Sequence, residues 1–184
     1  MNVLILGGTS ESRLLAARLS QDSRFDTLTS LAGRVSDPQL PEGDSRVGGF
    51  GGADGLATWI HSHAIEVVVD ATHPFAATMS GNAAMAAASA GVPLLRLNRP
   101  EWTARAGDVW LDASTPADAA RMVESFSERA FLTIGRLGVW AFAGNSRTWF
   151  LIRSIDAPVD ELPTRHELVL ARGPFDIDDE IATM

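Results

Sequence analysis

The stretch "DATHP" brings together side chains that can handle protons and anions. Asp70 offers a carboxylate, Thr72 a hydroxyl and His73 an imidazole, directly after the apolar residues 67–69, which are typical of a buried strand. Pro74 suits the first position of a helix that we expect to run to residue 90, and the amides at a helix N-terminus can hold an anion. We therefore predict a functional site here, with a histidine that serves only the core as the alternative.

Two glycines, Gly7 and Gly8, separate the apolar residues 3–6 from an amphipathic run that predicts a helix. Such a turn lets backbone N–H groups approach a phosphate at the positive end of the helix dipole. The full G-x-G-x-x-G fingerprint is absent, because Ser10 and Ser12 stand where spaced glycines are expected. The turn predicts either a phosphate site or a tight turn without a ligand, with Ser10 or the threonine before it as the helix cap.

The second strand candidate, residues 27–33, leads into Arg34. Rossmann sites selective for NAD carry an acid near the end of this strand, whereas an arginine accommodates the 2′-phosphate of NADP. Here Asp26 lies at the opposite end, so we predict that Arg34 pairs with a phosphate dianion; an ordinary surface arginine is the alternative. The loop "GGFGG", residues 48–52, permits close backbone approach to a ligand, although glycines also occur simply where a loop must turn.

The elements that must position these residues alternate along the chain. Strand candidates begin near residues 3, 27, 67 and 94, and helix patterns follow the first strand and cover about residues 54–63 and 74–90. This alternation predicts an α/β fold with an open, mostly parallel, doubly wound Rossmann-like sheet, in which ligands gather at the carboxyl ends of the strands.

A second, smaller α/β domain is expected at residues 113–184, after a cofactor-binding domain at residues 1–112. A helix is predicted in "TPADAARMVESF", and strands in "AFLTIG", "WFLIRSI" and "HELVLARG". The last segment, "PFDIDDEIATM", resembles the opening of a helix with no strand after it. We therefore expect this domain to be incomplete.

The composition excludes several kinds of chemistry. The net charge of −8 argues against a nucleic-acid surface, and no apolar stretch predicts a membrane span. All 15 basic residues are arginine and there is no cysteine or tyrosine, so a Schiff base, a thiolate nucleophile, a disulfide and the Tyr–Lys pair of short-chain dehydrogenases are impossible. The absence of cysteine fits a reducing cytoplasm. His61 and His63 are two residues apart, on different faces of a helix, and predict no metal site.

Several motifs in order, "ILGGTSESRLLA", "SLAGR", "GGFGG", "DATHPFA", "LRLNRPEW", "FLTIGR" and "ARGPF", resemble the precorrin-6A reductase family of cobalamin biosynthesis. The resemblance implies two Rossmann-like domains with the site in the cleft between them. It implies that a hydride from NADPH reduces a double bond of a carboxylate-fringed macrocycle, turning precorrin-6A into precorrin-6B. By position, the residues implied to bind the cofactor are Gly7, Gly8, Thr9, Ser10, Arg34, Gly51, Gly52 and Thr72. Those implied to bind the substrate are Asp70, His73, Arg136 and Arg172, with His73 also the best candidate for a proton donor.

One departure from the family pattern bears on activity. Members continue past "ARGPF" through a further helix and a strand carrying "KNSGG", which this sequence lacks. Two other functions therefore stay open. The chain could be a dinucleotide-binding module or truncated remnant without catalysis, or a structural α/β partner protein that binds no dinucleotide.

Overall fold

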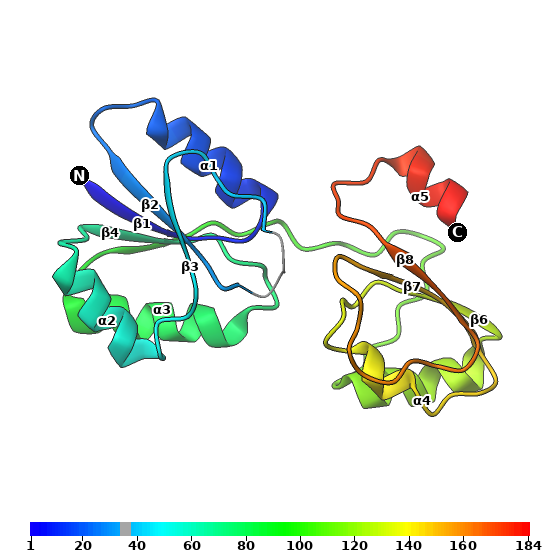
Figure 1. Ribbon diagram of the computed structural model, residues 1–184. Coiled ribbons are helices and arrows are strands. Elements are labelled where there is room, and N and C mark those ends of the chain that lie inside the picture. Colours follow the sequence, from blue (N-terminus) through cyan, green and yellow to red (C-terminus); the bar gives the residue numbers. More distant parts are fainter. Residues whose placement is uncertain (34–37) are drawn as a thin grey trace. The chain divides into compact units, whose positions relative to one another are not determined.

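The computed structural model describes residues 1–33 and 38–184, which form two compact units, Met1–Trp102 and Thr103–Met184 (Figure 1). Residues 97–112 are exposed and lie outside helices and strands, except for a turn at residues 106–107. The boundary between the units at residue 102 and the one expected from the sequence at residue 112 both fall in this irregular segment.

The first unit is built on a parallel sheet in the order β3-β2-β1-β4-β5. Its strands are β1 (Asn2–Leu6), β2 (Asp26–Leu31), β3 (Asp44–Val47), β4 (Val67–Asp70) and β5 (Leu94–Arg96). Its helices are α1 (Ser10–Ser20), α2 (Ala53–Ser62) and α3 (Ala77–Ala90). Because β1 pairs with both β2 and β4, the strand order reverses beside β1, which is where open α/β sheets bind ligands.

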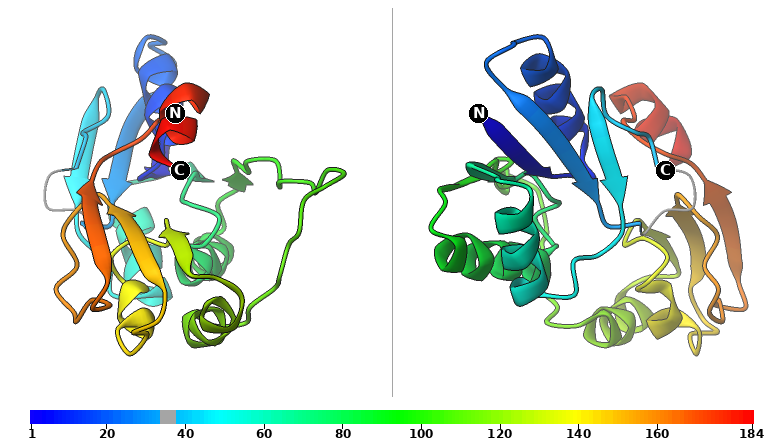
Figure 2. Two further views of the ribbon diagram at one scale, coloured as in Figure 1. Left: turned by 90° about the vertical axis from the view of Figure 1, so that its right-hand side faces the viewer. Right: turned by 60° about the vertical axis from the view of Figure 1, so that its left-hand side comes forward.

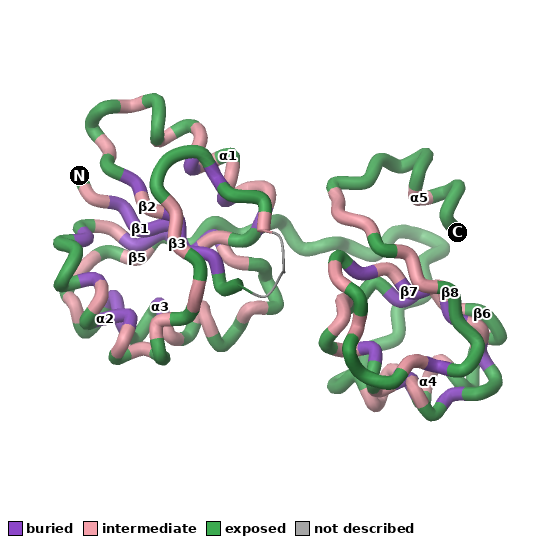
Figure 3. Tube along the Cα trace, viewed as in Figure 1, coloured by how far each residue is buried: buried purple, intermediate pink, exposed green. Residues whose placement is uncertain are grey.

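The alternation of side chains along β1 explains the three layers. Val3 and Ile5 pack against α1 through Ala16, whereas Leu4 and Leu6 pack against α2 and α3. Figures 1 and 2 show α1 on one face of the sheet and the two other helices on the opposite face. Burial is deepest in the central strands (Figure 3). Helices on both faces of a parallel sheet confirm the doubly wound prediction.

One predicted boundary is wrong. Helix α3 begins at Ala77 rather than at Pro74. Pro74 instead lies in a turn in which the Ala76 N–H donates to the His73 carbonyl oxygen at 2.8 Å and the Phe75 N–H donates to Nδ1 of His73. The imidazole thus takes up an amide near Pro74, and His73 lies in a turn that precedes the helix.

The second unit contains a three-stranded parallel sheet in the order β6-β7-β8. Its elements are α4 (Pro116–Phe126), β6 (Arg129–Leu132), the 3₁₀ helix η1 (Val139–Phe142), β7 (Trp149–Ser154), β8 (His166–Leu170) and α5 (Ile177–Thr183). The core forms around Phe142, Phe150 and Ile152. Buried residues alternate along β7, and α5 is attached by Arg153, which pairs with Glu180 at 2.6 Å. Among the described residues, no helix is both long and apolar enough to cross a membrane.

Candidate active site at the carboxyl edge of the first sheet

The turn after β1 brings the backbone close to β2. A Cβ added at Gly7 would lie 2.8 Å from Cγ2 of Thr29, and the Gly7 N–H donates to the Ser30 carbonyl oxygen at 2.9 Å. Gly8 has φ +119°, and a Cβ there would meet no atom within 4 Å. Only glycine fits at residue 7, and the turn has an open side at residue 8.

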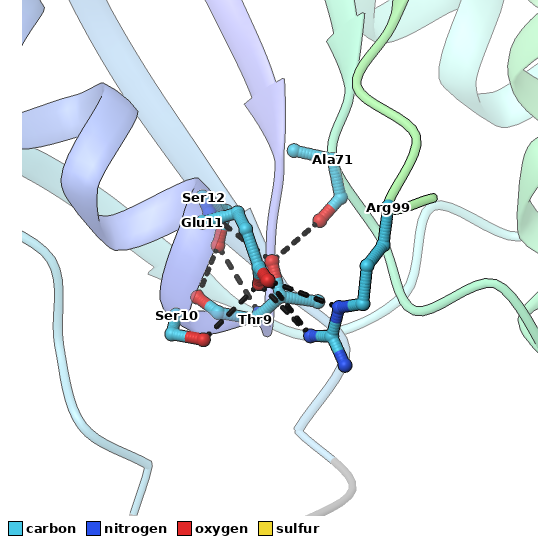
Figure 4. Close-up of polar contacts among 6 residues, drawn as sticks. All are labelled: Thr9, Ser10, Glu11, Ser12, Ala71 and Arg99. Atoms are coloured by element: carbon cyan, nitrogen blue, oxygen red, sulfur yellow. Dashed lines mark hydrogen bonds and ion pairs between the residues drawn. The ribbon is translucent and has the colours of Figure 1, made fainter. Parts of the chain in front are cut away.

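The first turn of α1 is closed by two buried hydroxyl groups (Figure 4). Thr9 Oγ1 accepts from the Ser12 N–H, and Ser12 Oγ accepts from the N–H groups of Thr9 and Gly8 at 3.1 and 3.2 Å. Thr9 Oγ1 also donates to the Ala71 carbonyl oxygen at 2.9 Å, which joins this turn to the end of β4. The hydroxyl of Thr9 is therefore occupied internally. Ser12, whose place in the glycine fingerprint counted against the motif, completes a capping box.

The buried carboxylate of Asp70 holds the start of the loop after β4 through hydrogen bonds. Its side chain is 2% exposed, and Oδ1 accepts from both the N–H and the hydroxyl of Thr72, at 3.2 and 2.7 Å. Oδ2 lies 3.7 Å from Nε of Arg96. With so little exposed surface, the carboxylate positions Thr72. The substrate contact predicted for Asp70 stays a prediction.

His73 is exposed at the same edge. Its Nδ1 accepts a hydrogen bond from the Phe75 N–H at 3.2 Å, which assigns the proton of the neutral ring to Nε2. Partial desolvation, followed by the charge of Arg99, lowers the pKa of His73 below its ordinary value of 6.5. The lowered pKa favours the neutral ring, whose Nε2–H can donate a hydrogen bond.

An ion pair that the sequence did not reveal lies beside these groups. Arg99, in the segment after β5, donates from Nε to Oε1 and from Nη2 to Oε2 of Glu11, at 3.0 and 3.1 Å. Hydrogen bonds from Arg99 and from the backbone of Glu11 lower the pKa of Glu11. The two residues are 88 positions apart, so no local pattern links them. A small pocket here is lined by Thr9, Glu11, Thr72, Pro74, Leu97 and Arg99.

The "GGFGG" loop is held by Arg46 at the end of β3. The guanidinium donates to Ser30 Oγ at 2.8 Å and to the carbonyl oxygens of Gly48 and Gly49, and it lies 4.2 Å from the ring centroid of Phe50. A Cβ at Gly55 would lie only 1.8 Å from the Phe50 carbonyl oxygen, whereas Cβ atoms at Gly51 and Gly52 would meet no atom within 4 Å. Arg46 and Gly55 thus fix the loop and leave its glycines accessible. Neither residue was singled out from the sequence.

Known proteins similar to this chain identify its family. The family model described as "Precorrin-6x reductase CbiJ/CobK" matches residues 2–184. The chain belongs to this family. It is 54% identical over 182 residues to the precorrin-6A reductase of Rhodococcus erythropolis, covering 99% of this chain and 73% of that protein. It is 47% identical over 184 residues to the precorrin-6A reductase of a Sinorhizobium species, with coverage of 99% and 70%. The solved structure "CobK precorrin-6A reductase" superimposes with a TM-score of 0.91 at 38% identity, covering 99% of this chain and 72% of that one.

Membership of the precorrin-6x reductase family makes the protein an oxidoreductase and confirms the resemblance and the α/β fold predicted from the sequence. The structure brings Gly7, Gly8, Thr9, Ser10, Thr72 and His73 to one edge of the first sheet.

Three arginines were predicted from the sequence to bind anions. Arg34 lies outside the described residues. Arg136 and Arg172 belong to the second unit. Nη1 of Arg136 lies 3.9 Å from Oδ2 of Asp156, and Arg172 follows β8. Within residues 1–33 and 38–184, no cluster of three or more His, Asp or Glu side chains is placed to hold a metal ion.

Proposed function

We propose that this member of the precorrin-6x reductase family catalyses the NADPH-dependent reduction of precorrin-6A to precorrin-6B in cobalamin biosynthesis. The observation that carries the proposal is the glycine turn between β1 and α1, at the point where the strand order of the first sheet reverses. In a chain of this family, such a turn supports a dinucleotide site rather than a turn without a ligand.

The residues at this edge fit a dinucleotide. The side chains of Thr29 and Ser12 leave no room for a Cβ at Gly7, which keeps the turn tight. The open faces at Gly8, Gly51 and Gly52 let an anionic ligand approach the backbone. We assign the phosphates of NADPH to the turn from Gly7 to Ser10 and the 2′-phosphate to Arg34. When bound, NADPH supplies the hydride.

The reaction also requires a proton donor and residues that bind the substrate. One carbon of the reduced double bond accepts the hydride, and its neighbour accepts a proton. We assign the proton to the imidazolium form of His73: the ring is exposed, and substrate carboxylates nearby would raise its pKa. Protonation of Nδ1 replaces the hydrogen bond from the Phe75 N–H, and loss of the Nε2 proton to the substrate returns the neutral ring. Arg136 and Arg172 are the proposed partners of substrate carboxylates, for which a guanidinium is well suited. We expect the enzyme to work in the cytoplasm, where NADPH is supplied.

Calorimetric titration tests the cofactor assignment. NADPH and NADH are titrated into the wild-type protein, into Arg34→Ala and into Arg24→Ala, whose arginine is exposed and pairs with Asp22 beyond the far end of α1. We expect a preference for NADPH that Arg34→Ala abolishes and Arg24→Ala leaves intact. Absence of binding by either nucleotide would refute the assignment.

Turnover is tested by following NADPH absorbance after addition of precorrin-6A. We expect consumption of one NADPH per macrocycle reduced. Binding of NADPH with no oxidation would show instead that the chain acts as a binding module.

A further inference from the structure

Glu11 already places a negative charge at the first turn of α1 (Figure 4). Its carboxylate accepts from Ser10 Oγ at 3.1 Å and from its own backbone, and it receives two hydrogen bonds from Arg99. A hydroxyl, a helix amide and a guanidinium are also the partners that proteins offer to phosphate. The carboxylate therefore occupies, within the chain itself, the position of an anionic ligand.

The pair is exposed enough to open. The side chains of Arg99 and Glu11 are 43% and 39% exposed, and ion pairs exposed to this degree are weak because water and salt screen them. Both residues line the pocket that also includes Thr9 and Thr72, so a ligand that reaches this pocket meets the pair directly. A phosphate in the same pocket would attract Arg99 and repel Glu11.

We propose that Arg99 binds the pyrophosphate of the dinucleotide, and that Glu11 holds Arg99 in place until the pyrophosphate displaces its carboxylate. This inference rests on the proposed function, since it takes the nucleotide site at the β1–α1 turn as given. It adds a cation from the segment after β5 and an internal competitor on α1, neither of which the glycine motif contains.

The exchange predicts effects of opposite sign from the two halves of one ion pair. Glu11→Gln removes the competing charge and keeps the shape of the side chain, so NADPH should bind about threefold more tightly. Arg99→Gln removes the cation, so NADPH should bind about tenfold more weakly. If the pair only stabilised the fold, both variants would disturb the site alike, and the two affinities would move in the same direction.

A second ion pair of the first unit provides matched controls. Arg24 and Asp22 pair at 2.6 Å beyond the C-terminal end of α1, so Asp22→Asn and Arg24→Gln make the same changes in net charge at the other end of the helix. We expect their dissociation constants for NADPH to stay within about twofold of wild type, because exposed charges that far apart are screened.

Fluorescence titration of the full chain and its variants with NADPH, NADH and inorganic pyrophosphate tests the inference. All three share the pyrophosphate, so the Arg99→Gln and Glu11→Gln effects should appear with each, whereas an Arg34→Ala effect should appear with NADPH alone. Effects of the same sign, or no effect, in the two pair variants would overturn the exchange while wild-type binding upheld the proposed function. Failure of the wild-type protein to bind any of the three would overturn both.

Discussion

Two turns of similar outline follow parallel strands in the two units, and they differ in what comes next. The turn after β1 contains Gly8 at φ +119° and enters the 11-residue helix α1, whose first turn is closed by the capping box. The turn after β6 contains Gly135 at φ +71° and enters the four-residue helix η1, which has no side-chain cap. The two turns therefore share a strand and a glycine but differ in the helix that follows. The sustained helix α1 provides the aligned amides.

The difference divides the proposed work between the units. The first unit contains the edge that we propose for the cofactor, with the glycine turn, His73 and the Glu11–Arg99 pair. The second unit offers arginines at its strand ends, among them Arg136 beside Asp156. Variants in corresponding places of the two units test this difference.

The largest difference is expected between two glycines. Gly7→Ala would place a methyl group 2.8 Å from Thr29 and 3.2 Å from Ser12, so we expect a loss of about 1–3 kcal/mol in the free energy of unfolding and at least about tenfold weaker NADPH binding. Gly135→Ala, in open space, should cost about 1 kcal/mol through its positive φ and leave NADPH binding unchanged. Chemical denaturation and calorimetry measure both quantities. Equal losses of binding in the two variants would remove the distinction between the turns.

The helix caps give a smaller contrast. Thr9 is buried and serves both the Ser12 N–H and the Ala71 carbonyl oxygen, so Thr9→Val should cost about 2–3 kcal/mol of unfolding free energy. Thr115 caps α4 in the same way but is exposed, so Thr115→Val should cost about 1 kcal/mol. Urea unfolding curves compare the two. A Thr115→Val loss as large as that of Thr9→Val would show that the link to β4 contributes nothing.

The smallest expected effect is a shift of a titration curve. Desolvation and Arg99 lower the pKa of His73, so its NMR titration should have a midpoint below 6.5, and Arg99→Gln should raise it. Because the lowered pKa favours the neutral ring in the folded protein, His73 contributes stability above pH 6.5, and that stability is lost as the pH falls toward the folded-state pKa. A wild-type midpoint at or above 6.5 would contradict the electrostatic description of this edge.

Local patterns predicted the elements well because hydrophobic period and turn residues act over short distances. The apolar residues 3–6 and 67–69 became β1 and β4, and Gly91 ends α3 in the left-handed conformation. The prediction of a helix start at Pro74 was wrong because a separate turn, in which the Ala76 N–H donates to the His73 carbonyl oxygen, precedes α3.

The site was only partly predictable because its main polar contacts join distant segments. Thr9 reaches Ala71 across 62 positions and Glu11 reaches Arg99 across 88, and neither spacing has a periodic signature. The sequence placed Asp70 at a strand end, but it did not reveal the contacts of its carboxylate with Thr72 and Arg96.

We propose that the edge of the first sheet holds the phosphates of NADPH. Titration of ¹⁵N-labelled protein with NADPH, followed by amide NMR spectra, tests it most directly at a chain mass of 19.6 kDa. We predict that the largest shift changes fall on residues 7–12, with further changes at Gly51 and Gly52. Unchanged amides at residues 7–12, with the largest changes instead at residues 133–142 after β6, would contradict the account.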